Sequence, residues 1–78
     1  MDIKVLGSGC PKCNLLEEVA KRAVAQAGID ATVEKVTDMA AIVGYGVLTT
    51  PALVVDGQIK ISGRVPSVDD LAALLTRG

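Results

Sequence analysis

Residues 2–13 read DIKVLGSGCPKC, and this stretch decides the fold. In its first part, Asp2 to Leu6, polar and apolar residues alternate and branched side chains are frequent, as is typical of a β-strand. The glycines in Gly7-Ser8-Gly9 then break the pattern and predict a loop. Two cysteines follow directly, Cys10 and Cys13. The stretch therefore predicts a strand, a loop and a pair of thiols at the start of the next element.

That next element is predicted to be an amphipathic helix. From Pro11 to Ala27, apolar residues recur at helical spacing, and charged residues occupy the opposite face. Pro11 fits the first turn, where its missing amide hydrogen is not needed, and Gly28 fits the C-terminal stop. Cys10 should therefore lie at the mouth of a helix, with Cys13 one turn inside it.

Residue patterns in the rest of the chain predict three strands and two helices. They are a strand over Thr32–Val36, a short helix over Met39–Val43 capped by Asp38, strands over Ala52–Val55 and Gln58–Ser62 joined by an Asp56-Gly57 hairpin, and a helix over Ser67–Thr76 opened by a capping box. The order is βαβαββα. Because a strand-helix-strand unit favours a parallel pair and a tight hairpin an antiparallel one, we expect an α/β fold with a four-stranded mixed sheet and helices on both faces.

Length and composition limit the class of protein. Seventy-eight residues, 50% of them hydrophobic, supply one modest core, so we expect a single domain over residues 1–78 and a monomer. The net charge of -1 leaves no basic stripe for nucleic acid. No segment approaches the roughly 20 apolar residues that span a bilayer. We therefore expect a cytoplasmic protein with neither nucleic acid nor membrane as a partner.

The cysteine pair indicates a reactive site rather than a disulfide that stabilises the fold. A disulfide across so short a loop removes little entropy from the unfolded chain. Unpaired amides and the positive end of the helix dipole favour the thiolate of Cys10, which makes it the attacking thiol, and Cys13 the resolving one. Between them, Lys12 adds a nearby cation, so Lys12 and Pro11 are candidates for tuning the thiolate.

Here the sequence resembles a known family. Gly7 to Cys13 after a strand resembles the active site of glutaredoxins and small thioredoxins, and Tyr45 to Gly57 is similar to the thioredoxin-family segment that contains a cis proline. The short archaeal and bacterial redox-active disulfide proteins are the nearest look-alikes. The resemblance implies a thioredoxin-like fold and a cis Thr50-Pro51 bond facing the cysteines, with Thr50 offering its amide and carbonyl to an extended substrate. Tyr45 could line the same groove or pack against the core.

The resemblance also implies an activity. The protein would reduce disulfides in protein substrates by dithiol exchange, and a flavoprotein disulfide reductase or a low-molecular-weight thiol would reduce it in turn. No bound cofactor and no metal are required, since two thiols suffice.

Departures from the family pattern affect the details of that activity. Gly9 stands where thioredoxins carry a tryptophan, and the first strand has Lys4 in its interior rather than an acid. Proton removal from Cys13 must then rely on solvent, on Lys12 or on the leaving group. After the last strand, Gly63 is followed by Arg64 instead of the glycine pair and acid that anchor glutathione in glutaredoxins. Specificity for glutathione is therefore not expected.

Two other functions use the same residues. A soft-metal carrier could hold Cu(I) or Zn(II) with the two thiolates, but carriers of this length run βαββαβ and end in a strand. A non-catalytic thioredoxin-like module that docks onto a partner would have no need of two reactive thiols. Both remain alternatives to the oxidoreductase.

Overall fold

The computed structural model describes residues 1–7, 11–47 and 49–77. The elements follow the predicted order: β1 (Asp2–Leu6), α1 (Pro11–Ala27), β2 (Thr32–Val36), α2 (Met39–Gly44), β3 (Ala52–Val55), β4 (Gln58–Ser62) and α3 (Val68–Arg77). The βαβαββα prediction is confirmed. The strand bounds agree with the sequence pattern, while α2 and α3 each end one residue later than expected.

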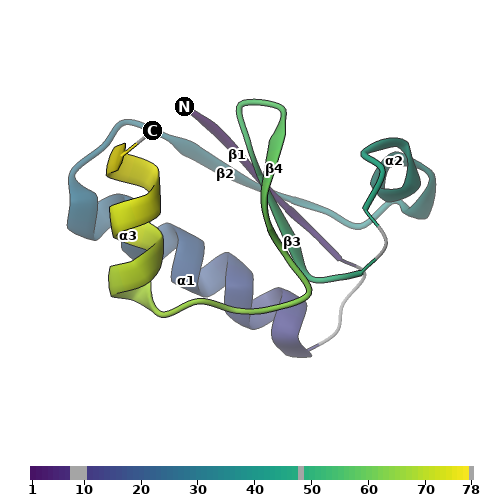
Figure 1. Ribbon diagram of the computed structural model, residues 1–78, viewed down its shortest axis with the longest axis horizontal. Coiled ribbons are helices and arrows are strands. Elements are labelled where there is room, and N and C mark those ends of the chain that lie inside the picture. Colours follow the sequence, from purple (N-terminus) through teal and green to yellow (C-terminus); the bar gives the residue numbers. More distant parts are fainter. Residues whose placement is uncertain (8–10, 48, 78) are drawn as a thin grey trace.

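In the described part of the chain, the strands form a four-stranded sheet in the order β2-β1-β3-β4 (Figure 1). β1 pairs with β2 in parallel, because α1 carries the chain back along the sheet, and β3 pairs antiparallel with both β1 and β4. The expected mixed sheet is therefore confirmed. It places the carboxyl end of β1, from which the cysteine loop departs, beside the start of β3, where Leu6 pairs with Ala52.

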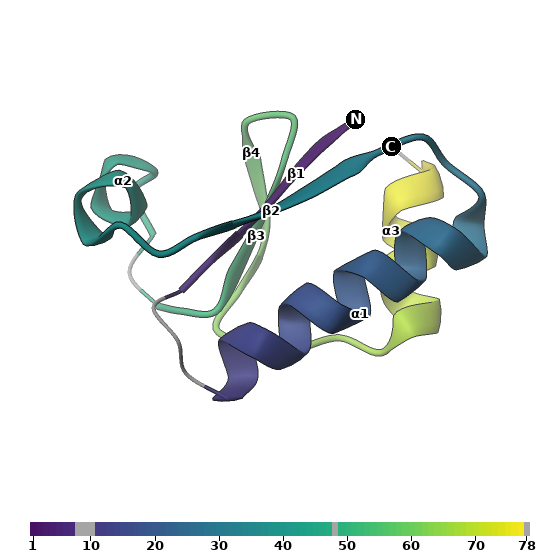
Figure 2. The same ribbon diagram turned by 180° about the vertical axis from the view of Figure 1, so that it is seen from behind.

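Helices cover both faces of the sheet, as predicted. On one face α1 and α3 lie side by side over β1 and β3 (Figure 2), and the shared core contains Ile3, Val5, Leu16, Ala20, Leu53, Val55, Leu71 and Leu75. On the other face α2 covers one end of the sheet, where Ile42 packs against Leu6, Ala52 and Val54. The larger core therefore fixes α1, the helix that carries Cys13, onto the sheet.

The hairpin between β3 and β4 is the turn that the sequence predicts. Asp56 and Gly57 have φ angles of 49° and 83°, the left-handed pair that a two-residue type I′ turn requires. The Asp56 carboxylate also accepts a hydrogen bond of 2.8 Å from the amide of Asp2. The turn is thereby tied to the start of β1, at the end of the sheet away from the cysteine loop.

The N-terminus of α3 offers a first test of the fold. The Ser67 hydroxyl accepts a hydrogen bond of 3.1 Å from the amide of Asp70, which is the forward half of the predicted capping box. Ser67→Ala should lower the free energy of unfolding by about 1 kcal/mol, because it removes this cap. Urea denaturation measures the loss, and Ser67→Asp, which keeps an acceptor, should retain most of the stability. Equal losses in the two variants would contradict a capping role.

Candidate active site

Cys13 lies in the first turn of α1 and is fully buried, at 0% exposure. It is disulfide-bonded in the structure. The structure thus buries the sulfur of Cys13, the residue that the sequence predicts to be the resolving cysteine. The predicted attacking cysteine, Cys10, lies outside the described residues.

The backbone of Gly7 forms the surface on which Cys13 packs. A Cβ built on Gly7 would lie 2.8 Å from the Cβ of Cys13 and would overlap its Sγ. Real Cβ atoms essentially never approach so closely, so only glycine leaves room for the thiol here. The Gly7 amide donates to the Val36 carbonyl at 3.0 Å, which holds this segment against β2. The end of β1 therefore serves as the floor of the site.

The predicted proline lies at the same end of the sheet. Because Leu6 pairs with Ala52 in antiparallel register, Pro51 comes next to the end of β1 from which Gly7 continues. The Thr50-Pro51 bond is cis, as the family resemblance implies. Pro51 is buried and Thr50 is exposed. The fold thus gathers Gly7, Cys13 and Pro51 at one corner, with Thr50 on the surface beside them.

Contacts to the end of β4 hold the segment that contains Pro51. The hydroxyls of Thr49 and Ser62 are hydrogen-bonded at 2.9 Å, and the Gly63 amide donates to the Pro51 carbonyl at 2.8 Å. Gly63 has a φ of 75°, and a Cβ there would lie 2.9 Å from the Thr49 hydroxyl oxygen. These contacts fix residues 49–51 relative to the sheet. Sequence analysis did not identify them, because residues 49 and 62 become neighbours only through the β3–β4 pairing.

Tyr45 lies apart from the two other predicted site residues, Pro11 and Lys12. Pro11 and Lys12 are exposed at the start of α1, directly before Cys13 in the chain. Tyr45 is half-buried on the opposite face of the sheet, where it packs against the core under α2. This is the packing position that the sequence left as an alternative to the substrate groove.

Lys4 also lies on the face opposite α1, since it pairs with Val54 of the α2-covered core. Its hydrogen bond to Tyr45 and the charge of that group, then the carboxylates of Asp2 and Glu34, raise the pKa of Lys4 above its ordinary value. Lys4 is therefore a half-exposed surface cation of the sheet, away from Cys13.

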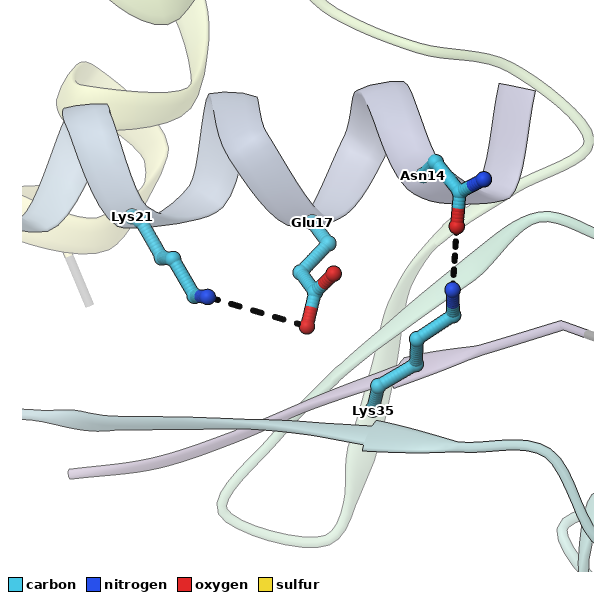
Figure 3. Close-up of polar contacts among 4 residues, drawn as sticks. All are labelled: Asn14, Glu17, Lys21 and Lys35. Carbon is cyan, nitrogen blue, oxygen red and sulfur yellow. Dashed lines mark hydrogen bonds and ion pairs between the residues drawn. The ribbon is translucent and has the colours of Figure 1, made fainter. Parts of the chain in front are cut away.

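A polar contact next to Cys13 was not predicted. The Lys35 ammonium, from β2, donates a hydrogen bond to the Asn14 side-chain oxygen in the first turn of α1 (Figure 3). Glu17 and Lys21 project from the same side of the helix and form an ion pair at 3.8 Å. Alternation in β2 does not identify Lys35, because Val33 on the same strand face and Val36 on the other face both pack against apolar residues.

The described residues form a pocket away from Cys13, but they contain neither a cluster of metal ligands nor a membrane-spanning helix. A pocket of about 220 Å³ is lined by Met1, Val55, Asp56, Gln58, Lys60, Leu74 and Leu75, at the end of the sheet away from Cys13. Within residues 1–7, 11–47 and 49–77, no three metal-ligating side chains cluster. In the same part of the chain, no helix has the length and apolar character to cross a membrane.

Comparison with protein families matches a thioredoxin domain over residues 1–76. The chain is 42% identical over 76 residues to a thioredoxin of Methanothermobacter thermautotrophicus, covering 97% of this chain and 99% of the relative. It is 44% identical over 69 residues to a thioredoxin of Methanocaldococcus jannaschii, covering 88% of this chain and 79% of the relative. The chain belongs to the thioredoxin family.

Family membership confirms the thioredoxin-like α/β fold and gives the general activity. A thioredoxin is a thiol-disulfide oxidoreductase, so disulfides are the kind of group on which this chain acts. The corner formed by Gly7, Cys13 and Pro51 is the candidate site for that chemistry.

Proposed function

We propose that this thioredoxin reduces protein disulfides by dithiol exchange between Cys10 and Cys13. The observation that supports the proposal most directly is Cys13 itself, a fully buried, disulfide-bonded residue in the first turn of α1. The sequence contains one other cysteine, Cys10, three residues earlier. A thiol pair at the start of a helix is suited to redox cycling.

The proposed reaction has two exchange steps. The Cys10 thiolate attacks one sulfur of the substrate disulfide, which forms a mixed disulfide and releases the first substrate thiolate. The Cys13 thiolate then attacks the Cys10 sulfur, forms the intramolecular disulfide and releases the second substrate thiolate. Two electrons pass to the substrate, and the two released thiolates take up protons from solvent.

The surrounding residues have supporting roles in this proposal. Lys12 and Pro11 tune the thiolate of Cys10, and the backbone of Thr50, with Pro51 behind it, binds the substrate chain. Thr50 is exposed and fixed through its neighbours Thr49 and Pro51, which supports that role.

The cycle needs an electron donor, which we propose to be a flavoprotein disulfide reductase or a low-molecular-weight thiol. A reducing pool of this kind is maintained in the cytoplasm, where a monomeric thioredoxin would work on protein substrates. No bound cofactor takes part, because both electrons are stored in the thiol pair.

The test is a redox titration of the purified protein against glutathione or dithiothreitol. We expect a reversible two-electron transition at roughly -180 to -300 mV, the range of thioredoxin-fold proteins that exchange disulfides in cells. Trapping the thiols and counting them by mass spectrometry measures the reduced fraction. Cys10→Ser is the control and should show no intramolecular transition.

The same titration separates the oxidoreductase from a soft-metal carrier. In one outcome the protein shows no reversible transition in the titration, and in another it loses its transition because a stoichiometric metal is bound. Either result would favour the soft-metal carrier over the oxidoreductase. The observed order βαβαββα, with the terminal helix α3, favours the oxidoreductase, since carriers of this length end in a strand.

A further inference from the structure

The pocket away from Cys13 lies between the β3–β4 hairpin, the start of β1 and the last turn of α3. The hairpin turn, the beginning of β1 and the C-terminal end of α3 meet at this end of the molecule (Figure 1). Val55, Leu74 and Leu75 line the pocket with apolar side chains, and Gln58 and Lys60 line it from β4. The pocket therefore combines an apolar wall with polar side chains that come from the hairpin.

The size of the pocket limits the ligands that it can hold. Its volume is about 220 Å³, less than the roughly 300–1,000 Å³ of pockets that bind drug-sized molecules. Val55 and Leu75 are only 8% and 4% exposed, so packing of the core fixes this wall. The pocket is thus suited to a small ligand that has a hydrocarbon part.

A β-bulge places Lys60 beside this wall. Leu53 pairs with Ile61 and Val54 pairs with Ile59, so Lys60 is the extra residue between the two pairs. Ile61 packs in the core under α1 and α3, although it directly follows Lys60, which lines the pocket next to α3. Two consecutive residues of β4 therefore face the same helix layer, which the regular alternation of a strand does not allow.

The charge of Lys60 has no partner within the protein. Lys60 is half-buried, and within the part of the chain that the structure describes no ion pair includes it. Asp56 lines the same pocket, but its carboxylate accepts a hydrogen bond of 2.8 Å from the amide of Asp2. The residues that α3 adds to the lining are both leucines. Since lysine is mostly exposed unless it is paired, an anion from outside the chain is the natural partner of Lys60.

We propose that this pocket binds a small carboxylate with a hydrocarbon tail. The tail lies against the apolar wall, where it is removed from water, and the carboxylate binds the Lys60 ammonium. Gln58 supplies amide hydrogens for the second carboxylate oxygen. A single cation near the Asp56 carboxylate favours a monoanion over a doubly charged phosphate, whose second charge would stay unpaired. The proposal does not depend on the dithiol exchange, which we place at the opposite end of β1.

Octanoate is the probe, because it carries one carboxylate and an unbranched tail. It should bind more tightly than butanoate, by up to about fourfold for each added methylene that is buried. Octanol has the same tail without the charge and should bind about tenfold more weakly than octanoate, the lower end of the effect of a hydrogen bond to a charged group. Acetate has the charge without the tail and should not bind measurably.

The experiment is a titration of the isotope-labelled, oxidised protein, followed by amide proton–nitrogen correlation spectra. The amide signals of Val55, Gln58, Lys60 and Leu74 should shift until they saturate, and that of Cys13 at the opposite end should not move. The concentration dependence of the shifts gives the dissociation constant, which we expect to be on the order of 1 mM for so small a ligand.

Matched variants separate the charge from the apolar wall. Lys60→Met removes the charge and keeps a flexible chain, so octanoate should bind about tenfold more weakly and octanol as before. Lys60→Arg keeps the cation and should retain octanoate binding. Lys21→Met removes a lysine of α1 that pairs with Glu17, and it should change neither affinity. Gln58→Glu adds a carboxylate to the pocket and should weaken octanoate binding alone, which also tests the inference if Lys60→Met does not fold.

Each part of the proposal has a result that overturns it. Equal affinities of octanoate and octanol for the parent protein would exclude recognition of the carboxylate by Lys60. Tighter binding of octyl phosphate than of octanoate would overturn the preference for a monoanion. Shifts that do not saturate by about 10 mM, or that centre on Cys13, would show that the pocket is not the binding site.

Discussion

Cys10→Ser is expected to reduce the rate of insulin disulfide reduction by at least roughly a thousandfold, because a serine hydroxyl stays protonated and cannot form the mixed disulfide. The turbidity of insulin precipitating in dithiothreitol measures this rate. Circular dichroism under reducing conditions is the control for folding, and it should show the same spectrum for the variant and the parent. A Cys10→Ser protein with parental activity would exclude Cys10 as the attacking thiol.

Cys13→Ser should fail at a different point in the cycle. Cys10 can still attack a substrate, but no resolving thiol follows, so a mixed disulfide should accumulate. Mass spectrometry under non-reducing conditions detects the trapped adduct, which Cys10→Ser should not form. An adduct in Cys10→Ser and none in Cys13→Ser would reverse the roles of the two cysteines.

The architecture could be predicted because its signals are local. The helix from Pro11 to Ala27 follows from apolar spacing, and the hairpin at Asp56 follows from a dipeptide whose two residues both adopt positive φ. The strand order follows from the sequence of elements, since a strand-helix-strand unit gives a parallel pair and a tight hairpin an antiparallel one. The cis bond before Pro51 followed from the family resemblance, not from residue spacing.

The contacts around Cys13 could not be predicted in the same way. Lys35 lies 21 residues from Asn14, and the hydroxyls of Thr49 and Ser62 lie 13 residues apart, so each contact depends on strand register. In β2, Val33 and Lys35 share one face and Glu34 and Val36 the other, so alternation does not show which face is buried. The register with β1 settles this, because Val5 in the core lies opposite Lys35.

Gly7 is the position where a small change should have a large structural effect. Gly7→Ala adds a methyl group that would overlap the side chain of Cys13, 2.8 Å from its Cβ and nearer still to its Sγ. Both neighbours are backbone-anchored at the end of β1 and the start of α1, so the helix must shift to relieve the overlap. We expect a loss of about 1–3 kcal/mol in the free energy of unfolding, the usual cost of overpacking a buried site. Urea denaturation of the reduced proteins measures this loss.

A glycine with free space around it provides the matched control. Gly44 ends α2, and a Cβ there would meet no atom within 4 Å. Gly44→Ala should therefore leave the stability unchanged or raise it by up to about 1 kcal/mol, since alanine is the better helix former. A loss at Gly44 equal to that at Gly7 would indicate a general effect of alanine rather than an overlap with Cys13.

A double-mutant cycle assigns the overlap to the thiol. Cys13→Ala removes Sγ, the atom nearest to the added methyl group, and keeps the Cβ. In the Cys13→Ala background, Gly7→Ala should cost less than in the parent, with a coupling energy of about 1 kcal/mol or more for two side chains in direct contact. All four proteins are compared under reducing conditions, so that the disulfide does not contribute. Additive losses would show that Gly7 is required by the backbone of β1 and not by the side chain of Cys13.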